Sequence, residues 1–116
     1  MENHRLVLPE HLNQYDFLFG GYLLMWVDEM AWMAASLDYP GCHFVTVGMR
    51  DVSFRKSVRG GSILRFETGR DGVGKTSVTY VVRVFRVFRE EEEIFSTGVT
   101  LVHVDENGCK ELLPKP

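Results

Sequence analysis

The residues of this sequence that could do chemistry together lie between Asn13 and Asp28. Gly20 and Gly21 open a long apolar segment with no further glycine or proline, which predicts a helix over Gly20 to Asp38. Free backbone N–H groups at a helix start and the positive end of the helix dipole can stabilise an oxyanion. Glycines there let a substrate carbonyl approach closely. The segment therefore predicts a site for chemistry on a carbonyl group.

Asp28 is the acidic residue of interest in this helix. It lies two turns in, with Leu24 one turn before it and Ala31 and Trp32 one turn after it, so it projects from an apolar surface. Acidic side chains are seldom buried without a partner or a use. From the residues alone two interpretations stay open: a structural partner satisfies the carboxylate, or the carboxylate serves as a base or nucleophile.

Two other motifs match known catalytic patterns but lack the structural context that those patterns require. Gly69 to Thr76 fits the Walker A pattern of nucleotide triphosphatases letter for letter. That loop needs a helix beginning at its Lys-Thr, whereas Ser77 to Val82 has the composition of a strand. Asp38 and His43 have the spacing of the catalytic pair of a class of enoyl-CoA hydratases, but Pro40-Gly41 between them indicates a plain turn. We therefore expect neither activity.

The rest of the chain predicts strands and turns around the helix. Segments dense in Val, Thr, Phe, Tyr and Ile predict strands at Arg5 to Leu8, His43 to Phe54, Ser62 to Thr68, Thr76 to Phe88 and Phe95 to Val104. Turn signals fall at Arg59-Gly60-Gly61, Gly69 to Gly74 and Glu90 to Glu93, the last interpreted as a solvated hairpin tip. The expected fold is a single α+β domain over residues 1–116. One long central helix is wrapped by a curved antiparallel sheet of about five strands.

Composition narrows the class of partner. A net charge of −3 over 116 residues argues against a nucleic-acid partner. No apolar run has the length of a membrane span, and the first residues lack the apolar core of a signal peptide. We expect a cytoplasmic protein in which Cys42 and Cys109 are reduced thiols. The histidines are scattered, so no metal site is expected.

The chain resembles the acyl-CoA thioester hydrolase family of hotdog proteins over nearly its whole length. The specific part is the interval from Asn13 to Asp28, with Phe19-Gly20-Gly21 and Trp26 to Glu29 inside it. Further matching pieces are Val45-Thr46, Phe54, Val58, Gly60, Gly74 to Val78 and Val102 to Gly108. The resemblance implies the hotdog fold and an acyl-CoA thioesterase without a cofactor, since coenzyme A is part of the substrate.

The resemblance also implies catalytic roles. Asn13 of one subunit and Asp28 of its dimer mate form the catalytic pair, while the thioester carbonyl binds at Gly20 and Gly21. Thr46 is a helper in the same site. Either Asp28 activates a water molecule, or it attacks the thioester and forms an anhydride; both routes stay open.

Coenzyme A binding is implied for other positions. The turn made of Gly74, Lys75, Thr76 and Ser77 corresponds to a family segment near the coenzyme. Lys75 and Arg55 or Lys56 could meet its phosphates, against the alternative that each is a solvated surface charge. The chain departs from the family at Asp16 and Gly61, usually glycine and aspartate, and at Ser57, usually proline. Asp16 could alter the loop that carries Asn13, because aspartate adopts some glycine conformations at a cost.

The helix and the later strands offer more apolar surface than one chain can cover. We therefore expect a homodimer with facing helices and sheets joined edge to edge, assembled further into a tetramer or hexamer. The rival to a thioesterase is a non-catalytic acyl-CoA-binding module, with an enoyl-CoA hydratase as a weaker alternative.

Overall fold

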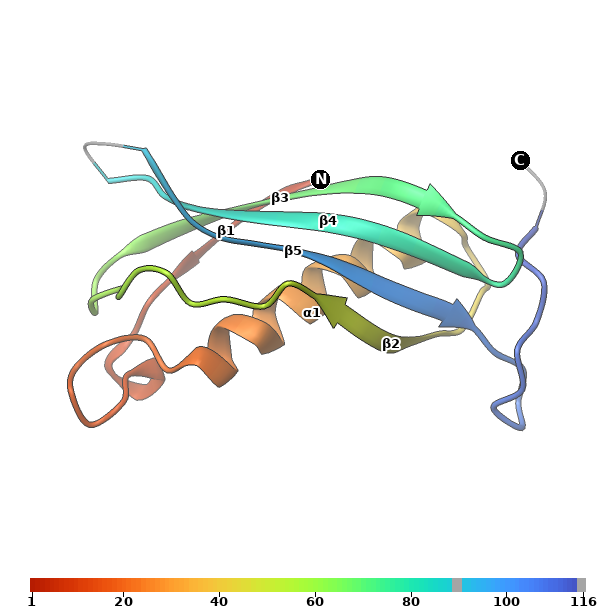
Figure 1. The fold of residues 1–116 in the computed structure, drawn as a ribbon, viewed down its shortest axis with the longest axis horizontal. Coiled ribbons are helices and arrows are strands. Elements are labelled where there is room, and N and C mark those ends of the chain that lie inside the picture. The colour runs from red at the N-terminus through yellow and green to blue at the C-terminus, as the bar shows by residue number, and fades with distance from the viewer. Residues whose placement is uncertain (89–90, 115–116) are drawn as a thin grey trace.

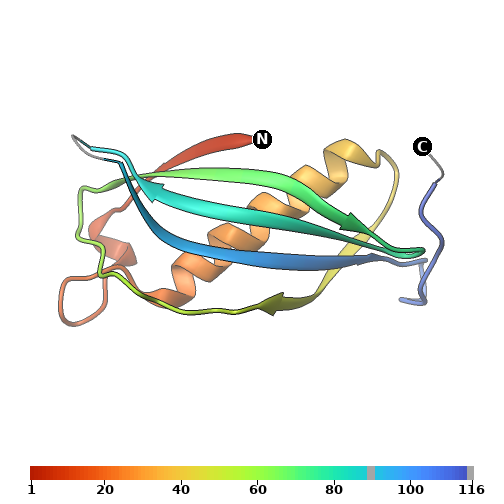
Figure 2. The same cartoon turned by 45° about the horizontal axis from the view of Figure 1, so that its top comes forward.

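The computed structural model describes residues 1–88 and 91–114. Within them lie one long helix, α1 (Gly20–Asp38), a short 3-10 helix, η1 (Pro9–His11), and five strands: β1 (Glu2–Leu6), β2 (Phe44–Arg50), β3 (Ile63–Val73), β4 (Ser77–Arg86) and β5 (Glu92–His103). All neighbouring strands are antiparallel, in the order β1-β3-β4-β5-β2. The sheet curves over α1, which crosses one of its faces (Figures 1 and 2). The predicted hotdog architecture is confirmed.

Helix α1 has the predicted bounds, Gly20–Asp38. Its buried side chains recur at helical spacing and face the sheet: Leu23, Trp26, Val27, Met30, Ala31, Ala34 and Ala35. The opposite side is also apolar but uncovered, since Met25, Trp32 and Leu37 are 46%, 48% and 72% exposed. One chain therefore covers only one side of a helix that is apolar almost all round.

Several predicted strand bounds are wrong. The opening strand, β1, is Glu2–Leu6 rather than Arg5 to Leu8. β2 stops at Arg50 rather than Phe54, because Asp51 adopts a left-handed conformation, with φ of 53°, and turns the chain out of the ladder. β3 continues through the predicted break at Gly69 to Gly74 and ends at Val73. Gly69 pairs with Val81, and a bulge after Arg70 absorbs one residue, so these glycines bend the strand without ending it.

The glutamate run is not a simple solvated tip. Glu90 lies outside the described residues, but Glu92 and Glu93 begin β5 and pair with β4, at 2.7 Å from Arg86 and 2.5 Å from Arg83. Glu91 forms an ion pair with Arg65 of β3. Opposite charges on facing strands stabilise the pairing, so cross-strand arginines override the turn signal.

Candidate active site

Asn13 stands in a loop that its own side chain organises. Its Oδ1 accepts hydrogen bonds from the backbone N–H groups of Tyr15, at 2.9 Å, and Phe17, at 3.2 Å. Its backbone N–H donates to the Phe17 carbonyl at 2.7 Å. Because two N–H donors face Oδ1, the Nδ2 group points the other way. Nδ2 has no partner among the described residues, so Asn13 offers a donor to whatever lies beside the loop.

Helix α1 begins without a side-chain cap. Phe19 is the N-cap and provides no capping hydrogen bond, and the N–H groups of Gly20 and Gly21 have no partner in the described part of the chain. A Cβ on Gly20 would lie 3.0 Å from the ring of Phe54, and one on Gly21 would lie 2.9 Å from the ring of Phe19. A side chain at either position would therefore have to displace one of these two half-exposed rings.

Asn13 and the glycine pair open into one groove of about 500 Å³. Its lining comprises Asn13, Phe17, Leu18, Phe19, Gly20, Gly21, Leu23, Leu24, Phe54, Arg55, Lys56, Ser57 and Val58. The groove thus combines unpaired N–H donors, apolar walls and two cations. Such a set of groups can hold a polarised carbonyl next to an apolar chain.

Asp28 lies elsewhere and contacts Thr46. The Thr46 hydroxyl, on β2, donates to Asp28 Oδ1 at 2.5 Å. Asp28 is half-buried, and its Oδ2 has no partner within residues 1–88 and 91–114. Asp28 follows Gly21 by seven residues, which is about 10 Å along the helix axis, and neither Asp28 nor Thr46 lines the groove. One chain therefore holds two sets of groups apart, one that donates hydrogen bonds and one that carries a carboxylate.

Arg55 and Lys56 differ in their surroundings. Lys56 Nζ lies 3.4 Å from Glu92 Oε2, whereas Arg55 has no ion-pair partner among the described residues. Both side chains line the groove that Asn13 also lines. Of the two, Arg55 is the cation that remains available to an anionic ligand.

The turn Gly74 to Ser77 lies far from this groove. It joins β3 to β4 at the opposite end of a molecule 43 Å long (Figure 1), with the Gly74 N–H donating to the Ser77 carbonyl at 2.8 Å. Lys75 therefore does not meet Arg55 within one chain. A strand, β4, comes directly after Lys75-Thr76, so the helix that a Walker A loop requires is not there, as predicted.

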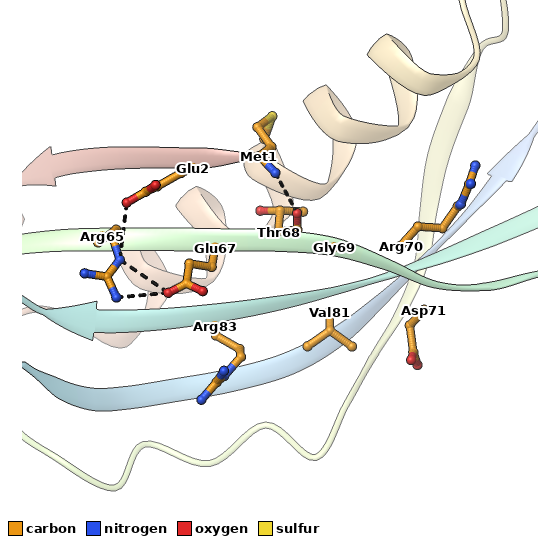
Figure 3. A pocket seen from close by; sticks show the side chains of 10 residues that line it. All are labelled: Met1, Glu2, Arg65, Glu67, Thr68, Gly69, Arg70, Asp71, Val81 and Arg83. Atoms are coloured by element: carbon orange, nitrogen blue, oxygen red, sulfur yellow. Dashed lines mark hydrogen bonds and ion pairs between the residues drawn. The ribbon is translucent and has the colours of Figure 1, made fainter.

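A larger groove, of about 630 Å³, contains none of the predicted site residues. Figure 3 shows three of its charged side chains engaged with one another: Arg65 pairs with Glu67 at 2.9 Å and with Glu2 at 3.4 Å. These side chains alternate along β3 with the buried Leu64 and Phe66, so they lie on the sheet face opposite α1. Size alone does not make this groove the active site.

Comparison with known proteins decides the family. The family model described as the Thioesterase superfamily matches residues 15–92. The chain belongs to the thioesterase superfamily. A Bacillus subtilis (strain 168) protein described as an uncharacterized acyl-CoA thioester hydrolase, YkhA, is 29% identical over 112 residues. That match covers 94% of this chain but 64% of the Bacillus protein, so the chain spans less than two thirds of this relative's length.

Solved structures share the fold closely. The hexameric thioesterase y2039 from Yersinia pestis superposes with a TM-score of 0.90 at 24% identity, covering 97% of this chain and 93% of that one. The acyl-CoA hydrolase from Staphylococcus aureus, solved with butyryl coenzyme A, coenzyme A and coenzyme A disulfide, has a TM-score of 0.88 at 26% identity, covering 98% and 71%. Variants of the Staphylococcus hydrolase with an aspartate, a threonine or an asparagine replaced by alanine have also been solved.

In this thioesterase-superfamily chain Asp38 and His43 do not form a pair. Asp38 Oδ2 accepts a hydrogen bond from the Tyr80 hydroxyl at 2.6 Å, while the His43 backbone N–H donates to His103 Nδ1 at 3.1 Å. Burial first, and then the bond to Asp38, raise the pKa of Tyr80. The hydratase-like spacing has a structural explanation at both positions.

The sequence did not predict the structural roles of two residues near these sites. Phe54, whose ring covers Gly20, lies 34 positions away from it, and no periodicity links them. His103 is 7% exposed; its Nδ1 holds the start of β2 and its Nε2 lies 3.2 Å from Glu111 Oε2. A histidine between Val102 and Val104 in an apolar strand is the signal that could have indicated a buried ring.

Three further expectations concern the cysteines, a metal site and a membrane span. Cys42 and Cys109 are free cysteines. Among residues 1–88 and 91–114 there is no group of three or more His, Cys, Asp or Glu side chains that could hold a metal ion. No helix in that same part of the chain is both long and apolar enough to cross a membrane.

The loop departure at Asp16 leads to a stability prediction. Asp16 adopts a φ of 65°, a conformation that glycine takes without the steric cost of a Cβ. Asp16→Gly is expected to raise the free energy of unfolding by roughly 0.5–1 kcal/mol in urea denaturation. Gln14→Gly, in the same loop but without a positive φ, is the control and should lower it. Equal losses in both variants would contradict this account.

Proposed function

We propose that this chain hydrolyses acyl-CoA thioesters to a free carboxylic acid and coenzyme A. The observation that carries the proposal is the groove in which the Asn13 amide and the unpaired N–H groups of Gly20 and Gly21 converge. Family membership and the acyl-CoA hydrolases named among the relatives support the same reaction. The aspartate, threonine and asparagine varied in the Staphylococcus hydrolase are the residue types of Asp28, Thr46 and Asn13.

In the proposed reaction the thioester carbonyl oxygen accepts hydrogen bonds at the start of α1. The N–H groups of Gly20 and Gly21 stabilise the negative charge that develops on this oxygen. Asp28 Oδ2 either takes a proton from the attacking water or attacks the carbonyl carbon itself to form an anhydride that water then opens. In both routes the C–S bond breaks, coenzyme A leaves as the thiolate and is protonated, and the acid is released.

A complete site needs two chains in this proposal. Asn13, Gly20 and Gly21 of one subunit face Asp28 and Thr46 of the other, because a single chain holds these two groups apart. The uncovered side of α1 and the exposed Val45 and Val47 of the edge strand β2 supply an apolar surface for a second copy. We propose a homodimer with sheets joined at β2, assembled further into a tetramer or hexamer; the Yersinia relative is described as hexameric.

The remaining proposals rest on the same chemistry. Asn13, Gly20, Gly21, Asp28 and Thr46 supply donors and a carboxylate, so the reaction as written needs no resident cofactor, and coenzyme A enters only as substrate. Turnover should accordingly survive treatment with a metal chelator. The free cysteines favour a reducing compartment, and we propose the cytoplasm.

Arg55 is proposed to bind a phosphate of coenzyme A. Because Lys56 already pairs with Glu92, Arg55→Ala should raise KM for acyl-CoA about tenfold, the scale of one charge-assisted hydrogen bond, with kcat little changed. Lys56→Ala is the matched control and should have the smaller effect. The difference should vanish with an acyl-pantetheine substrate, which lacks the nucleotide. A larger KM effect from Lys56→Ala would reverse the assignment.

The deciding experiment is a thiol-release assay with purified protein. The panel runs from acetyl-CoA to palmitoyl-CoA and includes an aromatic acyl-CoA. Thiol release with at least one substrate, lost on heat denaturation, is the expected result. Saturable acyl-CoA binding without any thiol release would instead establish a binding module and end the thioesterase proposal.

A further inference from the structure

Trp32 joins α1 to β2 beside the Asp28 carboxylate. Its indole Nε1 donates a hydrogen bond to the backbone carbonyl of Phe44 at 3.2 Å. Trp32 comes four residues after Asp28 on the helix, and Phe44 precedes Thr46 by two residues on the strand. Four helical residues rise about 6 Å and two strand residues span about 6.6 Å. The two hydrogen bonds between α1 and β2 are therefore matched in spacing, and each supports the geometry of the other.

β2 needs such support at this place. Within one chain it is an edge strand, paired with β5 alone among the described strands, and the pairing is interrupted between Thr46 and Gly48, leaving Val47 as an extra residue. Thr46 and Val47 are exposed, so core packing does not set the position of the Thr46 hydroxyl. Phe44 is the buried residue of this part of the strand, 6% exposed. Its carbonyl is the nearest point at which the helix holds β2 by a main-chain hydrogen bond.

We infer that Trp32 is a positioning residue for the Asp28 and Thr46 pair. Its indole N–H holds β2 at the height on α1 where the Thr46 hydroxyl reaches Asp28 Oδ1. That bond orients the carboxylate through its Oδ1. The inference rests on the proposed thioesterase function, in which Oδ2 does the chemistry, and it adds a role for a side chain that takes no direct part in the reaction.

The test is a double-mutant cycle on turnover. Trp32→Phe keeps an aromatic ring on the helix and removes the N–H donor, so kcat should fall about tenfold with KM little changed. Thr46→Ala should cause a loss at least as large. If Trp32 acts through Thr46, adding Trp32→Phe to Thr46→Ala should cost less than a further twofold. Losses that multiply in the double variant, or an unchanged kcat in Trp32→Phe, would overturn the inference.

Trp26→Phe is the matched control. The Trp26 indole N–H is buried and has no partner within the described residues, so the same chemical change there removes no hydrogen bond. It should lower thermal stability through lost packing and leave kcat within about twofold. A tenfold loss of kcat in Trp26→Phe would mean that any aromatic truncation of α1 slows the reaction, and the assignment to Trp32 would fail.

A second measurement does not depend on activity. In Trp32→Phe, hydrogen exchange should quicken for the amides of β2 at least about tenfold more than for those of β4, whereas in Trp26→Phe any acceleration should be equal in β2 and β4. If the wild-type protein released no thiol from any substrate, the proposed function would fail while the exchange data still decided whether Trp32 holds β2. Unchanged exchange in Trp32→Phe, with normal turnover in wild type, would overturn the inference alone.

Discussion

Asp28→Asn is expected to lower acyl-CoA turnover at least about 100-fold while the folded structure stays intact. The change keeps the size of the side chain and an oxygen that can accept the Thr46 hydrogen bond, but it removes the proton acceptor or nucleophile. Glu29→Gln is the matched control, because Glu29 is the adjacent, exposed acid of the same helix. It removes the same charge and should leave kcat unchanged. Near-normal turnover in Asp28→Asn would show that Asp28 is a structural residue.

Two variants of Asn13 should separate its contribution to turnover from its contribution to the loop structure. Asn13→Ala removes both the Nδ2 donor and the acceptor that holds the Tyr15 and Phe17 N–H groups, so it should lose turnover and about 0.5–2 kcal/mol of stability. Asn13→Asp keeps an acceptor for those groups, loses the donor and adds a negative charge, which also opposes an oxyanion. It should lose turnover at least about 100-fold with little change in stability. Retained turnover in Asn13→Asp would exclude the Nδ2 group from the reaction.

Mixing the two inactive variants is expected to restore activity. If the site is shared, a mixed dimer of Asn13→Asp and Asp28→Asn subunits contains one site with both residues intact and one site with neither. Random exchange makes half of the dimers mixed, so total activity should reach about a quarter of wild type from a nearly inactive start. Carrying each variant alone through the same exchange is the control, and both should stay inactive.

The mixing result distinguishes a shared site from a site within one chain. In a site within one chain, every mixed dimer would carry two singly damaged sites, and activity would not recover. Native mass spectrometry of the mixture confirms that mixed dimers have formed. Mixed dimers without recovered turnover, or a monomer in sedimentation that is fully active, would end the shared-site proposal.

Several elements could be predicted from the sequence because their signals are local. The bounds of α1 are set by an apolar run that begins after two glycines and ends before Pro40-Gly41, and both signals act within one or two turns. The signal against a Walker A loop is equally local, because the strand composition of Ser77 to Val82 rules out a helix after the turn. Strand ends were harder. Gly69 lies inside β3 and Glu92 inside β5, since cross-strand partners outweigh the preference of single residues.

The sequence alone determined which residue types could take part: the donor Asn13, the glycines at the helix start and a carboxylate two turns further on. Only the tertiary structure decided their grouping. It joined Asp28 to Thr46, 18 residues away on a bulged edge strand, and kept Asn13 in a separate groove at the start of α1, where Gly21 lies about 10 Å along the helix axis from Asp28. The physical reason is that helical spacing sets distances within α1, whereas the height of β2 on α1 depends on sheet register, a bulge and the Trp32 hydrogen bond.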